Sequence, residues 1–178
     1  MDPIRSDLIE AVRNGKYEEF QRLLGLVLAN DKNITKLNLL NIAVINFHFD
    51  IINYLLASEP LLIHHTDETN TPLHFICMCW TLTPDKREDE RIKIAKVLLA
   101  NEAGINAVTS SNTTPVNMAV ECELYELAKY LIMSGANYNI VNYYGDDVKA
   151  ILRRKGNVEF LQWLDKYEST PDVKEPEC

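Results

Sequence analysis

The sequence predicts an all-α fold in which five helix–turn–helix repeats stack into a solenoid. First, similar segments recur with a period of 33 residues: Asn38 and Thr71 open one matching pair, and Thr114 and Asp147 open another. Second, the apolar residues of each segment recur in three- and four-residue steps, as on the buried face of an amphipathic helix. Third, short polar turns separate the paired runs, two of them with glycine where a helix should stop. A single helix pair cannot bury its apolar face, so the repeats must stack.

The five predicted repeats follow one another along almost the whole chain. They span residues 5–36, 37–69, 70–112, 113–145 and 146–165. Their second helices contain the apolar runs 20–24, 51–56, 95–99, 127–132 and 160–164. The first and last repeats are the least regular, as expected for capping repeats that have one face in water. Residues 166–178 are rich in proline and acidic side chains, which predicts a disordered acidic tail.

The third and fourth repeats each open with a threonine and a proline, Thr71-Pro72 and Thr114-Pro115. A threonine hydroxyl at the N-cap accepts a hydrogen bond from an otherwise unpaired backbone N–H. A proline at the next position has no N–H to leave unpaired. Both dipeptides therefore predict a helix that begins directly after the threonine.

The third repeat carries an insertion between its two helices. Thr71 and Thr114 are 43 residues apart, ten more than the period, and the extra residues fall within 80–91. Thr83-Pro84 followed by an acidic residue has the composition of a helix start, so we expect the second helix to begin there. Because residues 85–91 are all polar, we expect this extension to protrude into water.

Several motifs resemble those of the ankyrin repeat. The segment Thr71-Pro72-Leu73-His74 resembles the opening motif of its first helix, and residues 134–139 resemble the motif that ends its second helix. Asn142 and Gly145 match the family's Asp and Gly positions in the hairpin before the next repeat. The resemblance covers about residues 5–165. It implies an ankyrin-repeat solenoid with short β-hairpin fingers that functions by binding other proteins.

One histidine and two cysteines, His74, Cys77 and Cys79, lie within six residues of each other. Cys77 takes a position that is valine in neighbouring repeats, so we expect it to behave as a small buried apolar residue. Cys79 is about 200° further around a helix, so the two thiols cannot converge on one ion. His74 occupies the family's own histidine position, where it braces the hairpin. We expect no metal site and no cofactor.

The composition limits the classes of function. A net charge of −8 argues against nucleic-acid binding, which needs clustered Lys and Arg. No signal peptide and no membrane-spanning segment is visible. Cys122 and Cys178 are isolated in the sequence, and we expect all four cysteines to be reduced thiols in the cytoplasm or nucleus. No nucleophile or phosphate-loop motif is present, so we expect no enzymatic activity.

Candidate partner-binding residues are those that break the repeat. Trp80 and Leu82 occupy a position where other repeats carry turn residues, beside the charged Lys86 and Arg87. They either pack under the added turn or anchor a partner, since an exposed tryptophan near charged residues is a common hot spot.

The remaining candidates lie in the loops. Tyr138, Tyr143 and Tyr144 fall on the fourth hairpin, where they either pack along it or contact a partner with little loss of entropy. Asp67 and Glu68 belong to a stretch without Lys or Arg that would suit a basic partner, although solubility alone explains a moderate acidic excess. Asn112 is the last of the candidate partner-binding residues.

The resemblance implies a non-enzymatic adaptor or regulatory subunit. Small ankyrin proteins of the cyclin-dependent-kinase-inhibitor and Plutonium types regulate kinases, so a protein kinase or cell-cycle factor is the expected partner. An alternative is an inhibitor-of-NF-κB-like protein that masks a basic segment of a transcription factor. That family has longer acidic extensions, whereas only five residues precede Ser6, where the first matching segment starts here. A homotypic structural spacer is a third interpretation.

Overall fold

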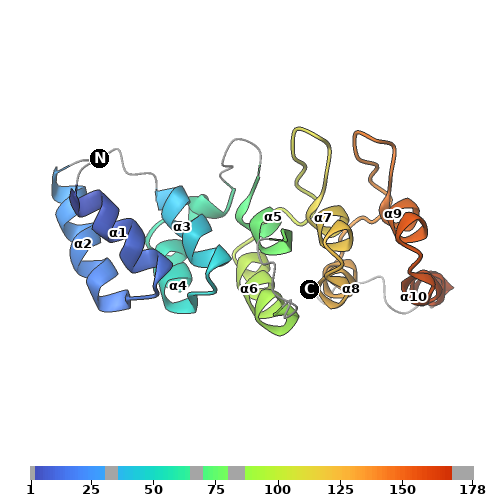
Figure 1. The fold of residues 1–178 in the computed structure, drawn as a ribbon, viewed down its shortest axis with the longest axis horizontal. Coiled ribbons are helices and arrows are strands. Elements are labelled where there is room, and N and C mark those ends of the chain that lie inside the picture. Colours follow the sequence, from blue (N-terminus) through green and yellow to red (C-terminus); the bar gives the residue numbers. More distant parts are fainter. Residues whose placement is uncertain (1–2, 31–35, 65–69, 80–86, 170–178) are drawn as a thin grey trace. The chain divides into compact units, whose positions relative to one another are not determined.

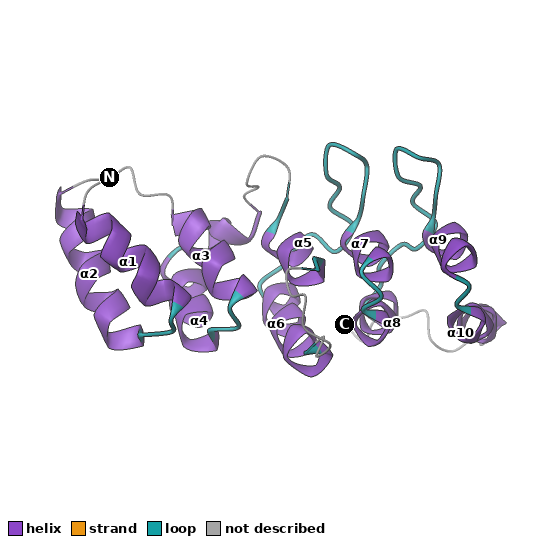
Figure 2. Cartoon of the chain, viewed as in Figure 1, coloured by secondary structure: helices purple, strands orange, loops and turns teal. Residues whose placement is uncertain are grey.

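The computed structural model describes residues 3–30, 36–64, 70–79 and 87–169. These residues form ten α-helices and one 3-10 helix and contain no β-strand, so the fold is all-α (Figures 1 and 2). The first helices of the five predicted repeats are α1 (Pro3–Arg13), α3 (Lys36–Ile45), α5 (Pro72–Cys77), α7 (Pro115–Glu121) and α9 (Val148–Lys155). The second helices are α2 (Tyr17–Asn30), α4 (Phe49–Ser58), α6 (Glu88–Ala100), α8 (Tyr125–Met133) and α10 (Val158–Ser169). Each predicted second run lies in its helix, which confirms five helix pairs in sequence order.

The chain forms two compact units. The N-terminal unit comprises Met1–Ile76 and Lys93–Ala103, and the C-terminal unit comprises Cys77–Ile92 and Gly104–Cys178. In the N-terminal unit, α1 packs on α2 and α3, and α4 packs on α2, α3 and the 3-10 helix η1 (Pro60–His64). The fully buried Phe20 of α2 makes an edge contact with the ring of Tyr54 in α4, with 5.5 Å between their centroids.

In the C-terminal unit, α7 packs on α8 and α9, and α9 packs on α10. Figure 1 shows α7 and α9 side by side in one row, with α8 and α10 in a second row. The buried Phe160 of α10 makes an edge contact with Tyr125 of α8, with 5.9 Å between ring centroids. Two long loops, the fingers, precede α7 and α9 and extend away from the helices (Figure 2).

The helix starts follow the capping chemistry that the sequence predicts. The Thr114 hydroxyl accepts a hydrogen bond from the backbone N–H of Asn117 at 3.2 Å, and Pro115 takes the first helical position. The Thr71 hydroxyl accepts from the backbone N–H of His74 at 3.4 Å. At the other end of a helix, Gly156 ends α9 with φ 69°, a conformation that glycine adopts without steric cost.

The predicted start of the second helix in the third repeat is wrong in one respect. Arg87 has φ 46°, in the left-handed region, so no continuous helix runs from Thr83 through it, and α6 begins at Glu88. Residues 80–86 lie outside the described part of the chain. The expectation that all of 85–91 protrudes into water is also wrong at its end, because Arg91 is buried. Its Nη1 donates a hydrogen bond to the backbone oxygen of Met78 at 3.0 Å, which gives the buried guanidinium a partner.

The ends of the described chain add two observations. The helix α10 continues to Ser169, so residues 166–169 are helical although the sequence places the end of the domain at 165. Residues 170–178 of the predicted tail lie outside the described residues. No helix in the described part is both long enough and apolar enough to cross a membrane.

Candidate functional site

The finger before α9, residues 138–147, has a tip whose shape is fixed by one asparagine. The side-chain oxygen of Asn142 accepts hydrogen bonds from the backbone N–H groups of Tyr144 at 2.9 Å and Asp146 at 3.0 Å. Gly145 follows in a left-handed conformation, with φ 82°, that a side chain would disfavour. These are the two residues that match the Asp and Gly positions of the ankyrin hairpin in the sequence. The tip is therefore a closed turn.

A second finger, residues 105–113, lies against the first. The backbone N–H of Tyr143 donates to the oxygen of Ser111 at 2.8 Å, and the Asn112 side-chain amide donates to the oxygen of Val141 at 2.6 Å. Near the base, the backbone N–H of Asn137 donates to the side-chain oxygen of Asn106 at 2.8 Å. The two fingers hold each other, so Asn112 contributes mainly by joining them.

Four apolar or aromatic side chains project from the two fingers. Tyr143 and Tyr144 are 82% and 84% exposed, and their rings meet edge to face. Val108 and Val141 are 46% and 48% exposed. We call these four residues the fingertip surface. Of the two interpretations of the tyrosines, packing along the finger is excluded for Tyr143 and Tyr144, because so little of either ring is covered.

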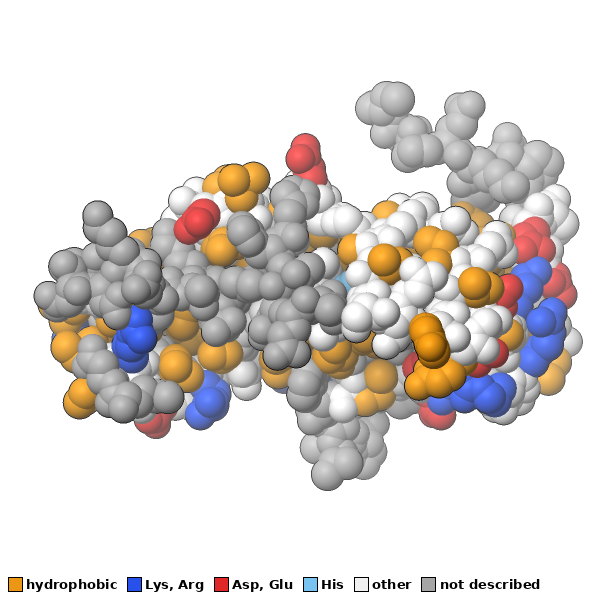
Figure 3. Space-filling model, turned by 90° about the horizontal axis from the view of Figure 1, so that it is seen from above, with side chains coloured by type: hydrophobic (Ala, Val, Ile, Leu, Met, Phe, Trp, Pro, Cys, Tyr) orange, Lys and Arg blue, Asp and Glu red, His pale blue; other side chains and the backbone are white. Residues whose placement is uncertain are grey.

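The fingertip surface is uncharged. Neither residues 104–114 nor residues 134–145 contain an acidic or basic side chain. Viewed from the side on which the fingers protrude, the C-terminal unit shows hydrophobic side chains among uncharged groups, and most Lys, Arg, Asp and Glu lie toward α9 and α10 (Figure 3). This absence of charge over two loops is the signal that would have identified Val108 and Val141, which the sequence analysis missed.

The structure separates Tyr138 from the other two tyrosines. Its hydroxyl donates a hydrogen bond to the Oε1 atom of Glu168 in α10, at 3.1 Å. Burial raises the pKa of the Tyr138 phenol, and the hydrogen bond and negative charge of Glu168 raise it further. Lys149 also reaches Glu168, at 2.8 Å. Tyr138 thus fixes the finger to the last helix pair and does not belong to the fingertip surface.

The fingers are anchored at their base by a buried asparagine, Asn117 of α7. Its side-chain amide donates to the backbone oxygens of Ile140 at 3.1 Å and Asp146 at 3.4 Å. Its side-chain oxygen accepts from the Thr114 hydroxyl. Because Asn117 is fully buried, these hydrogen bonds are shielded from competition with water.

The other predicted candidates do not join this surface. Arg87 is exposed and forms an ion pair with Glu90 at 3.5 Å, within the start of α6. The remaining predicted residues lie outside the described residues, and they are Trp80, Leu82, Lys86, Asp67 and Glu68.

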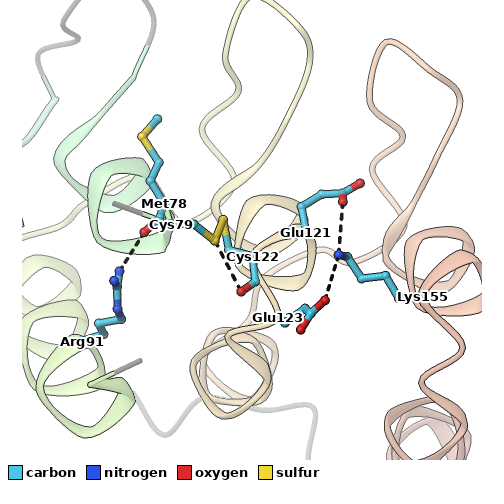
Figure 4. Close-up of a disulfide and its surroundings, with 7 residues drawn as sticks. All are labelled: Met78, Cys79, Arg91, Glu121, Cys122, Glu123 and Lys155. Carbon is cyan, nitrogen blue, oxygen red and sulfur yellow. Dashed lines mark hydrogen bonds and ion pairs between the residues drawn. A yellow bond between two sulfur atoms is a disulfide. The ribbon is translucent and has the colours of Figure 1, made fainter. Parts of the chain in front are cut away.

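Two cysteines that the sequence analysis treats as isolated thiols form a disulfide. Cys79 and Cys122 are bonded, with 5.5 Å between their Cα atoms (Figure 4). The expectation of reduced thiols is wrong for this pair. The signal was present: each cysteine follows the threonine that opens its repeat by eight residues, so both take equivalent positions in consecutive repeats. The ten-residue insertion obscured that equivalence.

The remaining residues of the histidine–cysteine cluster are structural. Cys77 is buried, as expected, and burial raises the pKa of its thiol well above the usual range. His74 is also buried, and its Nδ1 lies within hydrogen-bond distance of the Thr71 hydroxyl and backbone N–H, at 2.9 and 3.2 Å. Among the described residues, no three His, Cys, Asp or Glu side chains form a group that could hold a metal ion.

Comparison with known proteins adds no family to this picture. No known family model matches the chain. No curated protein matches it either.

Proposed function

We propose that this chain is a non-enzymatic protein-binding module of the ankyrin type, an adaptor or regulatory subunit that contacts its partner with the fingertip surface. The observation that carries the proposal is the exposure of Tyr143 and Tyr144, both above 80%, on a finger whose backbone is fixed by hydrogen bonds. Isolated exposed tyrosines are common on protein surfaces. Two adjacent ones on a fixed tip, with Val108 and Val141 exposed on the same two fingers, offer an apolar contact surface.

The ankyrin-type solenoid is supported by the order and chemistry of the elements. Ten helices follow one another as five pairs, and helices α5 and α7 each begin with a proline that directly follows a threonine. The finger before α9 has its turn built by Asn142 and Gly145 at the expected positions. The fingers are loops in the described residues, and short β-hairpins remain part of the proposal.

The fingertip geometry favours binding for energetic reasons. A tyrosine has two rotatable side-chain torsions, so ordering it on a partner costs little entropy. The finger backbone is already ordered by the contacts to Asn142, Ser111 and Asn117, so binding incurs little further cost there. Tyrosines that become buried when a partner binds are among the residues that contribute most to the binding energy of an interface.

The absence of charge on the fingers bears on the kind of partner. An uncharged aromatic surface suits an apolar or mixed patch on a folded protein, and its affinity depends little on salt. We propose a protein kinase or cell-cycle factor as that partner, following the resemblance to small kinase-regulatory ankyrin proteins. The alternative, masking of a basic segment of a transcription factor, requires acidic contacts and would weaken steeply as salt rises.

A double substitution tests this function. The full-length chain and its Tyr143→Ser/Tyr144→Ser variant are used to purify partners from source cells, and the affinity for any recovered kinase or cell-cycle subunit is then measured with purified proteins. We expect binding to weaken at least about tenfold. Val158→Ser is the matched control, because Val158 is an apolar side chain of the same unit that is 60% exposed and lies outside the fingers.

Two results would contradict the proposal. Equal affinity of the double variant and the wild type would exclude the fingertip surface as the contact. A steep loss of wild-type affinity with rising salt, together with recovery of a basic transcription-factor segment, would favour the alternative partner class.

A further inference from the structure

We propose that Cys79 and Cys122 form a reversible thiol–disulfide modification site that exchanges with small disulfides of the glutathione class. This inference is independent of the proposed partner binding. It follows from how the two cysteines are held, how exposed they are and what else holds the C-terminal unit together.

Each cysteine lies in a segment that is held by a hydrogen bond other than the disulfide. Cys122 ends α7, where its N–H donates to the Met118 oxygen at 2.9 Å. Cys79 follows Met78, whose oxygen accepts from the buried Arg91 at 3.0 Å (Figure 4). The Cα separation of 5.5 Å lies within the range that a disulfide spans without backbone movement. Reduced thiols would therefore stay close enough to bond again.

A hydrogen bond without sulfur joins two other elements of the same unit, the start of α6 and the helix α8. The carboxylate of Glu88, at the start of α6, accepts a hydrogen bond from the backbone N–H of Leu127 in α8 at 3.0 Å. This contact and the packing of α7 on α8 and α9 do not involve sulfur. The C-terminal unit therefore retains its connections when the disulfide is open, as a reversible site requires.

Exposure distinguishes this pair from the third cysteine of the segment. Cys79 is exposed and Cys122 is half-buried, so a small thiol can reach the bond. Cys77 lies two residues from Cys79 but is fully buried, and burial raises the pKa of its thiol. Exposed disulfides are the labile ones, whereas buried thiols stay inert because the thiolate is the reactive form.

The residues on both sides of Cys122 are acidic, and a lysine offsets part of their charge. Glu121 and Glu123 flank it in the sequence, and Lys155 of α9 lies 3.9 Å and 3.4 Å from their carboxylates (Figure 4). The ammonium offsets part of the repulsion that two carboxylates would exert on a thiolate or on an anionic glutathione.

The exchange proceeds in two balanced steps. The thiolate of one cysteine attacks glutathione disulfide, forms a mixed disulfide and releases one glutathione thiolate. The second cysteine then attacks the protein-bound sulfur, which forms the Cys79–Cys122 bond and releases the second glutathione. The two protein thiols lose two electrons and two protons, and glutathione disulfide gains them and becomes two glutathione thiols. Excess reduced glutathione reverses both steps.

The test is a redox titration of the full-length chain. The protein is equilibrated at a series of ratios of reduced to oxidised glutathione, quenched with acid and alkylated, and each cysteine is quantified by peptide mass spectrometry. We expect Cys79 and Cys122 to change together from a disulfide to two alkylated thiols within the series. We expect circular dichroism to show a folded chain at both ends, with Cys77 unreactive until the protein is denatured.

Three outcomes of the titration would overturn the proposal. A disulfide that persists in excess reduced glutathione would be a permanent structural bond. Two thiols that persist in oxidised glutathione would exclude the bond. Unfolding on reduction would also exclude a reversible site.

A single-cysteine variant checks the pairing itself. In Cys79→Ser, Cys122 has no resolving partner, so we expect it to retain one glutathione as a mixed disulfide. The matched control is Cys77→Ala, which should leave the titration of the other two cysteines unchanged. Formation of the mixed disulfide on Cys77 in place of Cys122 would contradict the assignment.

Discussion

Asn41 and Asn117 are the same residue type at the same position of their repeats, yet within the described residues only the side chain of Asn117 has hydrogen-bond partners. Both are buried, with exposed fractions of 4% and 0%. Asn117 donates to two backbone oxygens of the finger before α9 and accepts from the Thr114 hydroxyl. For Asn41, neither side-chain polar atom has a hydrogen-bond partner within the described residues.

The difference arises from where each helix begins. The helix α7 starts directly after the capping residue Thr114, so Asn117 lies in its first turn beside a hydroxyl and the base of a finger. The helix α3 already starts at Lys36, so Asn41 lies deeper in its helix. This repeat also has Asn38 at the position of the capping threonines of the third and fourth repeats. Burial alone therefore does not give a side chain a hydrogen-bond role. The hydrogen-bond partners of Asn117 come from the capping threonine and from the finger beside the helix start.

The largest effect is expected for Asn117→Ala. This substitution removes the amide that holds Ile140 and Asp146 and leaves the Thr114 hydroxyl without its acceptor. We expect the free energy of unfolding to fall by about 3 kcal/mol, because several buried hydrogen bonds are lost together. Denaturant unfolding followed by circular dichroism measures it. A loss below about 1 kcal/mol would show that the finger does not depend on Asn117.

A smaller effect is expected for Thr114→Val, which keeps the side-chain shape and removes the hydroxyl. The N-cap bond to the backbone N–H of Asn117 is lost, and N-cap substitutions cost about 1–2 kcal/mol. The matched control is Thr113→Val, since Thr113 is only partly buried and does not cap α7. Equal destabilisation by both substitutions would mean that the N-cap bond of Thr114 adds no special stability. Capping would then not explain the difference between Asn117 and Asn41.

The sequence predicts the helix pairs and the turn residues because both follow from local chemistry. Thr114, Pro115, Asn142 and Gly145 act through neighbours within a few positions, and each has its expected role. Thr83-Pro84 also has the local pattern of a helix start, but the left-handed Arg87 interrupts any helix from there to α6.

Features that depend on distant partners could not be predicted in this way. Tyr138 and Tyr144 look alike in the sequence, and only the contact of Tyr138 with Glu168, 30 residues away, separates them. The charged side chain of Arg91 predicts exposure to water, but Arg91 is buried and donates a hydrogen bond to the backbone oxygen of Met78. The Cys79–Cys122 pair was the exception, because equal positions in consecutive repeats would have identified it.

Asn41→Leu is expected to change stability in the opposite direction. Replacing a buried amide that lacks hydrogen bonds with an apolar side chain of similar size removes its desolvation cost, so we expect a gain of about 1 kcal/mol in the free energy of unfolding. Asn117→Leu serves as the matched control and should be strongly destabilised. If Asn41→Leu were as damaging as Asn117→Leu, Asn41 would have an essential polar role and the contrast between the two residues would fail.

The smallest effect is expected for Tyr138→Phe, which releases the outer attachment of the finger that Asn117 holds at its base. The lost hydrogen bond to Glu168 lies near the surface, so we expect at most about 0.5 kcal/mol near neutral pH. Because the pKa of Tyr138 is raised in the folded chain, folding favours the protonated phenol. This contribution is complete below the usual tyrosine pKa of about 10 and is lost as the pH rises through the folded value. Wild type should therefore lose more stability than Tyr138→Phe above about pH 10, and parallel pH profiles of the two proteins would exclude the Tyr138–Glu168 attachment.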